Sequence, residues 1–498
     1  MNVPRVPTRK RRTHPGIAAR LQAMRVALIQ ASAVDESLAL AEVAGVLKQR
    51  GHRLRLFLER HEVRFQTKVE AFRPDVAVVQ AAIMCEPWLK SVLARLPKTL
   101  PTLLVGTAAT FDADIVSRTG AFGAVQGELD DALPAVVDAM EAGGDLSEIP
   151  SVVLLRPDGT VHVSPWSEPP DDLDGRALPD RAMYFDTYPF MGRFPWKRFT
   201  TGRGCVHSCG FCYLPQLRAG YGGLKPAVRR KSVSRVLEEV RAVQRRWPLR
   251  SLHFADDLFA PSRPWLEEFA DRFPREVGLP FSCNTSPETV TERNAELLAR
   301  AGARVVGIGV EVASDEQRVN LLGRPTSNEA IRRAASRLKA RGVRLATFNM
   351  LANPGEGLED ALETMRFNQE LGADFPRAQL AYPTPGSHLE TLSSQRGVEL
   401  PSPDSFERKD VRAWCADGDG SSFESLARVF RLAVRWRLPT SVVRPLISTG
   451  ASSALAPLVF YDAALELGWT GVSIVDALRY ARHTGPPVSR ATYHESIP

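Results

Sequence analysis

The first part of the chain, from residue 24 to about residue 144, alternates short apolar runs with amphipathic segments. Five of the apolar runs are predicted strands: 25–30, 53–58, 75–83, 102–105 and 124–126. Apolar residues at helical spacing lie between them, for example in 39–48 and 86–96. Repeated βα units of this length predict an α/β domain with a parallel, doubly wound sheet. Ligands of such sheets bind at the carboxyl ends of the strands.

A connector is expected from residue 145 to residue 197. Two short apolar runs, 152–155 and 161–164, flank a Pro-Asp-Gly turn and predict a β-hairpin. A run rich in proline and aspartate follows and extends through Pro179. We interpret the connector as a linker with a small β decoration.

The βα alternation starts again at residue 198 and continues to about residue 390. Six runs are predicted strands: 198–201, 251–254, 280–283, 305–310, 344–351 and 377–382. A closed barrel of this kind needs eight units, so we expect a partial (β/α)6, TIM-like barrel with its chemistry at the carboxyl ends of the strands. From 391 to 498 the pattern turns helical and predicts a helical C-terminal region.

Composition and charge narrow the class of protein. The chain has 498 residues, 44% hydrophobic and 24% charged, which suits two or three folded cores and excludes a mainly disordered chain. No apolar run is long enough to span a membrane, and the first residues lack the apolar stretch of a secretory signal. The arm 1–23 holds six basic residues and no acid, so only +1 of the net charge of +7 belongs to the rest of the chain. We expect a disordered basic arm, a cytoplasmic protein, and neither a nucleic-acid nor a membrane partner.

Three of the six cysteines fall within eight residues, at Cys205, Cys209 and Cys212, directly after the first predicted barrel strand. Six cysteines are too few for a disulfide framework in a chain of this length. Three thiolates on one glycine-containing loop can ligate three irons of a cubane cluster and leave the fourth iron open. The alternative is a structural zinc site made with His207, although zinc sites usually take their ligands from two separated pairs.

The cysteine loop resembles the signature of the radical S-adenosylmethionine (SAM) superfamily, CxxxCxΦC, in which an aromatic residue, here Phe211, precedes the last cysteine. In that family the loop follows the first strand of a partial (β/α)6 barrel. The resemblance implies that Cys205, Cys209 and Cys212 ligate a 4Fe-4S cluster whose open iron chelates the amino and carboxylate groups of SAM. Electron transfer from the cluster then cleaves SAM to methionine and a 5′-deoxyadenosyl radical.

Further segments resemble the SAM-binding positions of that family in the same chain order. The resemblance implies that Asp256 and Asp257 after the second strand meet the methionine amino group and that Asn284 on the third strand lies near the ribose. It also implies a site role for Glu311 after the fourth strand, and it places Arg324 where a cation reaches the carboxylate. The segments resembling the ends of the fifth and sixth strands are 353–356 and 382–386. The structural alternative is that the three acids cap helices or pair with arginines.

The α/β domain before the barrel resembles the Rossmann-like cobalamin-binding domain of cobalamin-dependent radical SAM enzymes of the class B methyltransferase type. Segment 106–110 stands where that subclass has a Gly-Gly-Pro-His-like turn, 125–130 resembles its Val-x-Gly-Glu-Gly-Glu segment, and 229–232 its Arg-x-Arg-Ser segment. The residues that this resemblance implies for cobalamin contacts are Gln30, Gly106, Thr107, Gly127 and Glu128.

The combined resemblance implies an enzyme that moves a methyl group from methylcobalamin to an unactivated carbon, or to phosphorus, of a small natural-product-type substrate. The 5′-deoxyadenosyl radical would activate the substrate, and an electron donor such as flavodoxin or ferredoxin would reduce the cluster. Two alternatives remain open. One is an oxidative cyclase or rearrangement enzyme with the same cofactors but without methyl transfer. The other is a non-catalytic cobalamin carrier, which would need no cluster.

Overall fold

The computed structural model describes residues 23–32, 36–83, 85–223, 228–382, 386–395, 420–455, 457–458 and 473–484. The expected basic arm up to residue 22 and the residues 383–385 of the sixth-strand segment lie outside the described residues. The chain forms two compact units. The first contains the residues up to 188 together with 217–223, and the second contains 189–216 and the described residues from 228 onward.

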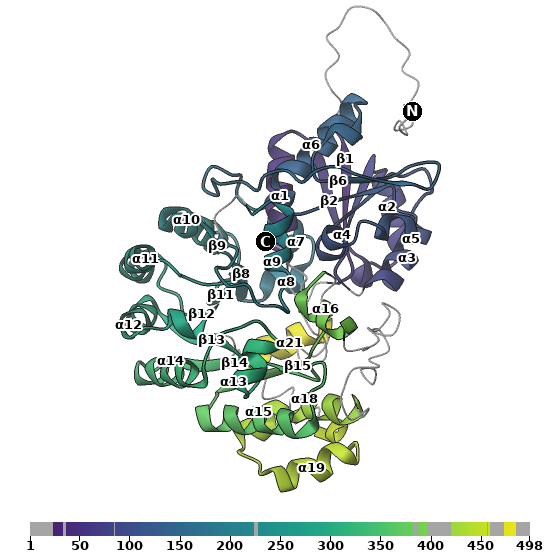
Figure 1. Cartoon of the computed structure of the whole chain (residues 1–498). Coiled ribbons are helices and arrows are strands. Elements are labelled where there is room, and N and C mark those ends of the chain that lie inside the picture. The colour runs from purple at the N-terminus through teal and green to yellow at the C-terminus, as the bar shows by residue number, and fades with distance from the viewer. Residues whose placement is uncertain are drawn as a thin grey trace, which may run out of the picture. The chain divides into compact units, whose positions relative to one another are not determined.

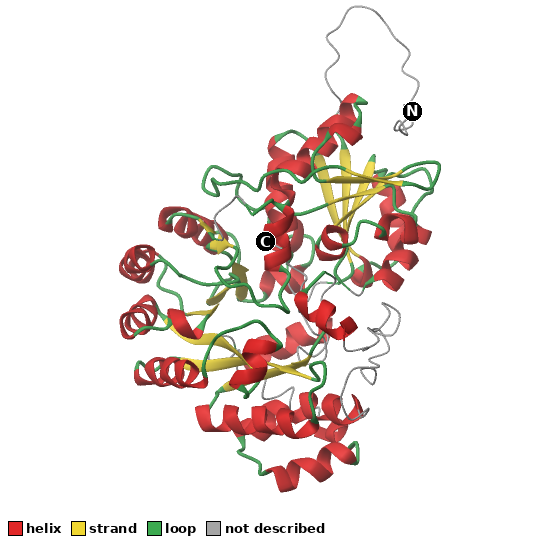
Figure 2. Ribbon diagram, viewed as in Figure 1, coloured by secondary structure: helices red, strands yellow, loops and turns green. Residues whose placement is uncertain are grey.

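The first unit is built on a seven-stranded sheet with the order β2-β1-β3-β4-β5-β6-β7 (Figures 1 and 2). Its strands are β1 (Arg25–Gln30), β2 (Arg53–Leu58), β3 (Val76–Gln80), β4 (Thr102–Val105), β5 (Gly123–Val125), β6 (Val152–Leu155) and β7 (Val161–Val163). The first five pair in parallel, which confirms the doubly wound prediction. The hairpin that we expected as a linker decoration instead extends this sheet, because β6 pairs antiparallel with β5.

Helices cover both faces of this sheet. They are α1 (Leu38–Gln49), α2 (Phe65–Phe72), α3 (Glu86–Arg95), α4 (Thr107–Phe111), α5 (Ile115–Thr119), α6 (Leu129–Ala142) and α7 (Ala182–Phe185), with 3₁₀ turns η1 (Glu59–His61) and η2 (Leu146–Glu148). Helices α1 and α6 pack together on one face, and α2, α3 and α5 lie on the other (Figure 1). Alternate strand residues such as Ile29 and Val79 pack against Phe65 and Trp88 of the second group.

The second unit is built on a six-stranded, fully parallel sheet whose strands follow one another in chain order. They are β8 (Trp196–Phe199), β11 (Ser251–Phe254), β12 (Phe281–Thr285), β13 (Ala303–Glu311), β14 (Arg344–Leu351) and β15 (Phe375–Leu380). The sheet does not close on itself, since β8 and β15 are its edges. This confirms the predicted partial barrel. A separate two-stranded ribbon pairs β9 (Gly202–Arg203) with β10 (Arg229–Arg230).

The helices of the barrel begin where the sequence supplies caps. They are α8 (Pro189–Arg193), α9 (Leu214–Gly220), α10 (Val233–Gln244), α11 (Arg263–Glu276), η3 (Pro287–Thr289), α12 (Glu292–Ala301), α13 (Asp315–Asn320), α14 (Asn328–Ala340), α15 (Leu358–Leu371) and α16 (His388–Gln395). The side chains of Ser232, Thr291 and Ser327 accept hydrogen bonds from backbone N–H groups three residues further on. Each of these caps starts a helix that returns the chain to the next strand.

The C-terminal region is helical, as predicted, and packs onto the barrel. Its described elements are α18 (Gly420–Arg435), α19 (Thr440–Ser448), η4 (Ala451–Leu455) and α21 (Ile474–Thr484). Helix α18 contacts β15 and α15, and its Phe423 and Phe430 join the core between sheet and helices. Helix α21 contacts α8 next to the other edge of the sheet, where Tyr480 stacks on Phe194 with ring centroids 4.1 Å apart. Among the described helices, none is long and apolar enough to cross a lipid bilayer.

Candidate active site

The three clustered cysteines lie on one loop of the second unit, between β9 and α9. Cys205, Cys209 and Cys212 form no disulfide bond, and all three are half-buried. Burial raises the pKa of Cys209 to about 11 and also raises the pKa of Cys212. Thiols ligate iron as thiolates, so a positively charged group on this loop would have to offset the burial. A metal cluster bound by the three sulfurs would supply that charge.

The cysteines do not surround one small ion. Among the described histidine, cysteine, aspartate and glutamate residues, one group has three ligand atoms within 4.8 Å of one another, and it is His52, Asp138 and Glu141. Thiolates of a tetrahedral zinc site would lie about 4 Å apart, because each zinc–sulfur bond is about 2.3 Å long. The three cysteines and His207 therefore form no such compact group in the described part of the chain.

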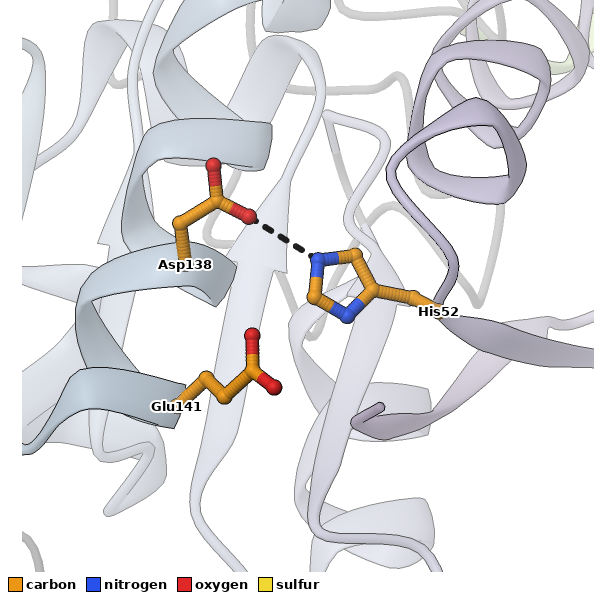
Figure 3. Close-up of side chains that lie close together, drawn as sticks. All are labelled: His52, Asp138 and Glu141. Atoms are coloured by element: carbon orange, nitrogen blue, oxygen red, sulfur yellow. Dashed lines mark hydrogen bonds and ion pairs between the residues drawn. The ribbon is translucent and has the colours of Figure 1, made fainter. Parts of the chain in front are cut away.

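The group around His52 lies in the first unit, at the end of the sheet opposite the carboxyl ends of the parallel strands (Figure 3). The backbone N–H of Met24 donates to His52 Nδ1 at 3.3 Å, so the neutral ring carries its proton on Nε2. His52 Nε2 then donates to Asp138 Oδ1 at 2.9 Å, and Arg50 also pairs with Asp138. The nitrogen that faces the carboxylates is thus a donor, which suits a hydrogen-bonded brace rather than a metal ligand.

Two acids after β11 hold the cysteine loop in place. Asp257 accepts a hydrogen bond from the backbone N–H of Gly204 at 3.0 Å and from the Tyr213 hydroxyl at 3.4 Å. Asp256 accepts from the Thr201 hydroxyl at 2.6 Å and from the Thr201 backbone N–H at 3.0 Å. Both predicted site acids therefore contact the segment that carries the cysteines. Their contact with SAM stays a prediction.

Arg230 completes this anchor, and sequence reasoning missed it as an individual residue. It donates to the Thr201 hydroxyl at 2.7 Å and lies 3.9 Å from Asp256. Burial raises the pKa of Asp256, while Arg230 and Thr201 act in the opposite direction. Arg230 lies within segment 229–232, which resembles Arg-x-Arg-Ser, but it stands at the variable position of that pattern, so the resemblance did not single it out. Part of the structural alternative, in which strand-end acids pair with arginines, thus applies to Asp256.

The loop is also clamped around Gly210. Its backbone N–H donates to the Leu322 carbonyl at 2.8 Å, and its carbonyl accepts from the Leu389 N–H at 2.9 Å. A Cβ at this position would lie 3.1 Å from the His388 ring, so the glycine permits the close approach. Phe211 packs with Leu322 and Leu389 in a small apolar cluster. The aromatic residue of the signature therefore fixes the loop through packing.

Glu311 and Arg324 form a buried ion pair at 2.8 Å. The second carboxylate oxygen of Glu311, Oε2, is buried and has no hydrogen-bond partner among the described residues. Burial raises the pKa of Glu311, although Arg324 acts in the opposite direction. A Cβ on Gly309 would lie 2.3 Å from both Arg324 Nη1 and Glu311 Oε1, so only glycine leaves room for this pair. The remaining acceptor suits a donor group of a bound ligand, such as an ammonium.

Asn284 lies on the same inner face of the sheet. A Cβ on Gly307 would lie 2.6 Å from Asn284 Oδ1 and 2.7 Å from the Phe348 ring, so both side chains lie over this glycine. Gly307 and Gly309 point to the same side of β13, because successive residues of a strand alternate. The structure therefore brings together Asn284 and the Glu311–Arg324 pair.

A buried acid lies at the carboxyl end of β14. Glu356 Oε2 accepts from the Asn353 backbone N–H at 2.7 Å and from its side-chain amide at 2.8 Å. Glu356 Oε1 and Asn353 Oδ1 are buried acceptors without a hydrogen-bond partner among the described residues. Burial raises the pKa of Glu356 to about 7. The site therefore contains a carboxyl group that changes its charge near neutral pH.

In the first unit, the predicted cobalamin residues lie where β1 and β4 end, at one edge of the sheet. Gln30 accepts a hydrogen bond from the Tyr184 hydroxyl at 2.8 Å. Gly106 has φ 102°, in the region that favours glycine, and Thr107 accepts from the Ile83 N–H at 3.1 Å. These contacts shape the strand-end loops, and the ligand role of the three predicted residues stays a prediction.

Gly127 and Glu128 follow β5 at the same edge, and sequence reasoning missed the tyrosine that covers them. The Tyr221 hydroxyl accepts a hydrogen bond from the Glu128 N–H at 2.7 Å, and a Cβ on Gly127 would lie 2.5 Å from the Tyr221 hydroxyl oxygen. Trp166 contacts the Tyr221 ring edge-to-face at 5.2 Å and donates to Gln126 at 3.1 Å. The absence of a side chain at Gly127 thus leaves room for the Tyr221 hydroxyl.

The comparisons with known proteins agree with this geometry. Residues 199–367 match the model of the radical SAM superfamily. An uncharacterised methyltransferase of Pyrococcus horikoshii is 23% identical over 328 residues, which cover 64% of this chain and 70% of that protein. The anaerobic magnesium-protoporphyrin IX monomethyl ester cyclase of Rubrivivax gelatinosus is 24% identical over 371 residues, which cover 70% of this chain and 65% of that protein.

A solved structure extends the similarity to both units. It is the radical SAM methyltransferase TsrM from Kitasatospora setae, with cobalamin and a 4Fe-4S cluster bound. It has 18% sequence identity, covers 76% of this chain and 80% of its own chain, and has a TM-score of 0.61. The domain recognised from the cysteine loop and the order of the two folds are therefore confirmed. Residues 199–367 therefore form a radical SAM domain, and the chain has the fold of solved cobalamin-dependent radical SAM enzymes.

Proposed function

We propose that this protein is a cobalamin-dependent radical SAM methyltransferase that methylates an unactivated carbon, or phosphorus, of a small natural-product-type molecule. The observation that carries the proposal is the cysteine loop: three thiols, at Cys205, Cys209 and Cys212, on a segment that the strand-end acids Asp256 and Asp257 hold in place. The methyltransferase relatives support the type of reaction. When bound, the cluster supplies the electron that cleaves SAM, and cobalamin supplies the methyl group.

The residues of the chain would hold and orient these groups. The three cysteines would ligate three irons and leave one iron open for SAM. The unpartnered Oε2 of Glu311 would accept a hydrogen bond from a SAM donor group, and Asn284 lies beside it for a ribose hydroxyl. Arg324 would lend its charge to the methionine carboxylate while it remains bound to Glu311.

In the first unit, residues of the strand-end loops would hold cobalamin. The positive φ angle of Gly106 and the absence of its side chain allow a ligand to approach the backbone closely, whereas cobalamin at Gly127 would lie beside the Tyr221 hydroxyl that fills the space over this glycine. Thr107, Glu128 and Gln30 would add polar contacts at the same edge. A flavodoxin- or ferredoxin-like donor would reduce the cluster.

The test is anaerobic reconstitution with iron, sulfide and cobalamin, followed by incubation with SAM and a reductant. We expect the four irons of the cluster to be lost together when Cys205, Cys209 or Cys212 is replaced by alanine, along with all 5′-deoxyadenosine formation. Cys283→Ala is the matched control, because Cys283 is buried in the apolar core behind the sheet. Iron binding and 5′-deoxyadenosine formation that survive in the Cys209→Ala variant would contradict the proposal.

A second candidate is an oxidative cyclase or rearrangement enzyme with the same cofactors, and the cyclase of Rubrivivax gelatinosus favours it. Product analysis distinguishes the two. Methyl transfer releases S-adenosylhomocysteine together with 5′-deoxyadenosine, whereas cyclisation without methyl transfer releases only 5′-deoxyadenosine. A cobalamin carrier would bind cobalamin without iron, and the cysteine loop argues against it.

A further inference from the structure

Two hydrogen bonds hold the guanidinium group of Arg324 in one orientation. Its Nη1 donates to Glu311 Oε1 at 2.8 Å, and its Nε donates to the hydroxyl oxygen of Thr326 at 3.3 Å. Its Nη2 makes no hydrogen bond to any of the described residues. Because a guanidinium group is planar and rigid, bonds at two of its nitrogens also fix the direction of the third. Arg324 therefore presents one donor nitrogen, with two N–H groups, in a fixed direction.

A carboxylate orients the Thr326 hydroxyl group. This hydroxyl donates its hydrogen to Oε1 of Glu288 in η3, and Thr326 is only 3% exposed. A hydroxyl group has one hydrogen and two lone pairs, so the lone pairs remain for Arg324 once Glu288 accepts the hydrogen. Hydrogen bonds in such a chain polarise and strengthen one another. Glu288 thus supports the contact between Thr326 and Arg324.

Glu288 is a carboxylate at neutral pH. Partial burial raises the pKa of Glu288, but the hydrogen bond from Thr326, the Glu288 backbone N–H and the charge of Arg324 outweigh it, so the pKa lies below its usual value. A carboxylate can only accept hydrogen bonds. The direction of the Thr326 hydroxyl is therefore determined by the charge state of Glu288.

The backbone on both sides of Arg324 is held by Arg318, which is fully buried. The Arg318 carbonyl accepts the Arg324 N–H at 2.9 Å, and Arg318 Nη1 donates to the Thr326 carbonyl at 2.8 Å. Arg318 Nε also donates to the carbonyl of Val310, on β13, at 3.0 Å. The segment that carries Arg324 and Thr326 is thereby fixed to the same strand as Glu311.

We propose that Thr326, oriented by Glu288, is a positioning residue for SAM: it holds Arg324 so that Nη2 takes the methionine carboxylate. This inference rests on the proposed function, which assigns that carboxylate to Arg324. Both Thr326 and Glu288 act through Arg324, and the proposal gives them no contact with SAM. A guanidinium group that is already held loses less freedom when it binds an anion, so the contact gains affinity. Without the Thr326 hydroxyl, Arg324 could rotate while its Nη1 stays on Glu311.

The experiment compares two ligands by equilibrium dialysis on the reconstituted full-length protein, without reductant. One is SAM, and the other is decarboxylated SAM, which keeps the sulfonium and amino groups and lacks the carboxylate. We expect the wild type to bind SAM roughly tenfold more tightly. Thr326→Val should weaken SAM roughly fivefold and leave decarboxylated SAM within about twofold. Thr326→Ser keeps the hydroxyl and should bind both ligands as the wild type does.

Glu288 is tested in the same way. Glu288→Ala should weaken SAM selectively, because the Thr326 hydroxyl loses its acceptor, and Glu288→Gln should recover the loss, since its amide oxygen can still accept. The matched control is Ser327→Ala. Ser327 is the neighbour of Thr326 and its hydroxyl accepts the Ala330 N–H at 3.2 Å at the start of α14, so this variant disturbs the same segment without removing a contact to Arg324. It should not change the preference for SAM.

Loss of folding alone would weaken both ligands together, so the carboxylate-selective loss is the result that supports positioning. Equal losses for the two ligands in Thr326→Val, no recovery in Thr326→Ser, no effect of Glu288→Ala, or a wild type without preference for SAM would overturn the inference. The dialysis needs no methyl transfer. A wild type and variants that behave as expected here, with no methylated product in turnover assays, would contradict only the proposed function.

Discussion

Replacing Glu356 by glutamine should remove a pH dependence from the stability of the barrel. In the native protein, burial raises the pKa of this carboxyl group from 4.5 to about 7. The folded state therefore holds the proton more tightly than the unfolded state between these two values. The contribution of this carboxyl group to stability is greatest below about pH 4.5, falls as the pH rises toward 7, and changes no further above it. The shift of about 2.5 pH units corresponds to about 3 kcal/mol.

Glutamine should avoid this loss at high pH. Its amide oxygen can accept the two Asn353 hydrogen bonds that Glu356 Oε2 now accepts, and its amide nitrogen adds a donor on the side of the unpartnered Oε1. The melting temperature of a domain changes by roughly 2–4 °C per kcal/mol, so the variant should melt about 6–12 °C above the wild type at pH 8 and close to it at pH 4.5.

The assay is thermal denaturation followed by circular dichroism from pH 4.5 to pH 8.5, on full-length protein without added cofactors. Other buried acids also titrate, so the measured quantity is the difference between variant and wild type at each pH. Glu363→Gln is the control, since Glu363 is exposed on the same stretch of α15 that follows Glu356. Parallel curves for Glu356→Gln and the wild type over this whole range would refute the reasoning.

Three further variants test other parts of the structure. Gly309→Ala should weaken SAM binding at least tenfold, because the added Cβ would lie 2.3 Å from both Arg324 and Glu311. Equilibrium dialysis with labelled SAM measures this, and unchanged affinity would contradict it. Thr201→Val should lower the amount of iron bound after reconstitution, since it removes the hydroxyl that donates a hydrogen bond to Asp256 at 2.6 Å. An iron content equal to that of the wild type would show that this hydrogen bond is dispensable. His52→Ala should lower the free energy of unfolding by about 1–3 kcal/mol, because the buried Met24 N–H would lose its acceptor. A chelator should not reproduce that loss, and a matching effect of EDTA on the wild type would instead indicate a metal at this group.

Much of the barrel could be predicted from the sequence, because its strands have strong local patterns. The predicted runs 251–254 and 344–351 have the same bounds as β11 and β14. Both are bounded by helices and alternate between the apolar core and the barrel interior. The hairpin 152–164 was also found, but its pairing with β5 was not, since the choice of a partner strand depends on contacts far apart in the chain.

In the candidate site, too, the features with a local sequence signal could be predicted, and the contacts between distant residues could not. The spacing of Cys205, Cys209 and Cys212 is local and chemically specific, so it led directly to the superfamily. The residues that hold the loop were missed as partners because they are distant in sequence. Thr201 and Asp256 are 55 residues apart, and Glu128 and Tyr221 are 93 residues apart. Hydrogen bonds of this kind leave no periodic signal in the sequence.

The packing of α18 on β15 limits how this enzyme can be shortened. A fragment that ends at residue 395 would keep every strand of the second sheet, yet it would uncover the apolar surfaces that Phe423 and Phe430 now cover. Exposed apolar surface beside a strand at the edge of a sheet promotes association between chains. Such a fragment should therefore aggregate on expression. Val443 and Ile447 of α19 (Thr440–Ser448) belong to the same core, so a minimal soluble barrel has to include the chain through α19.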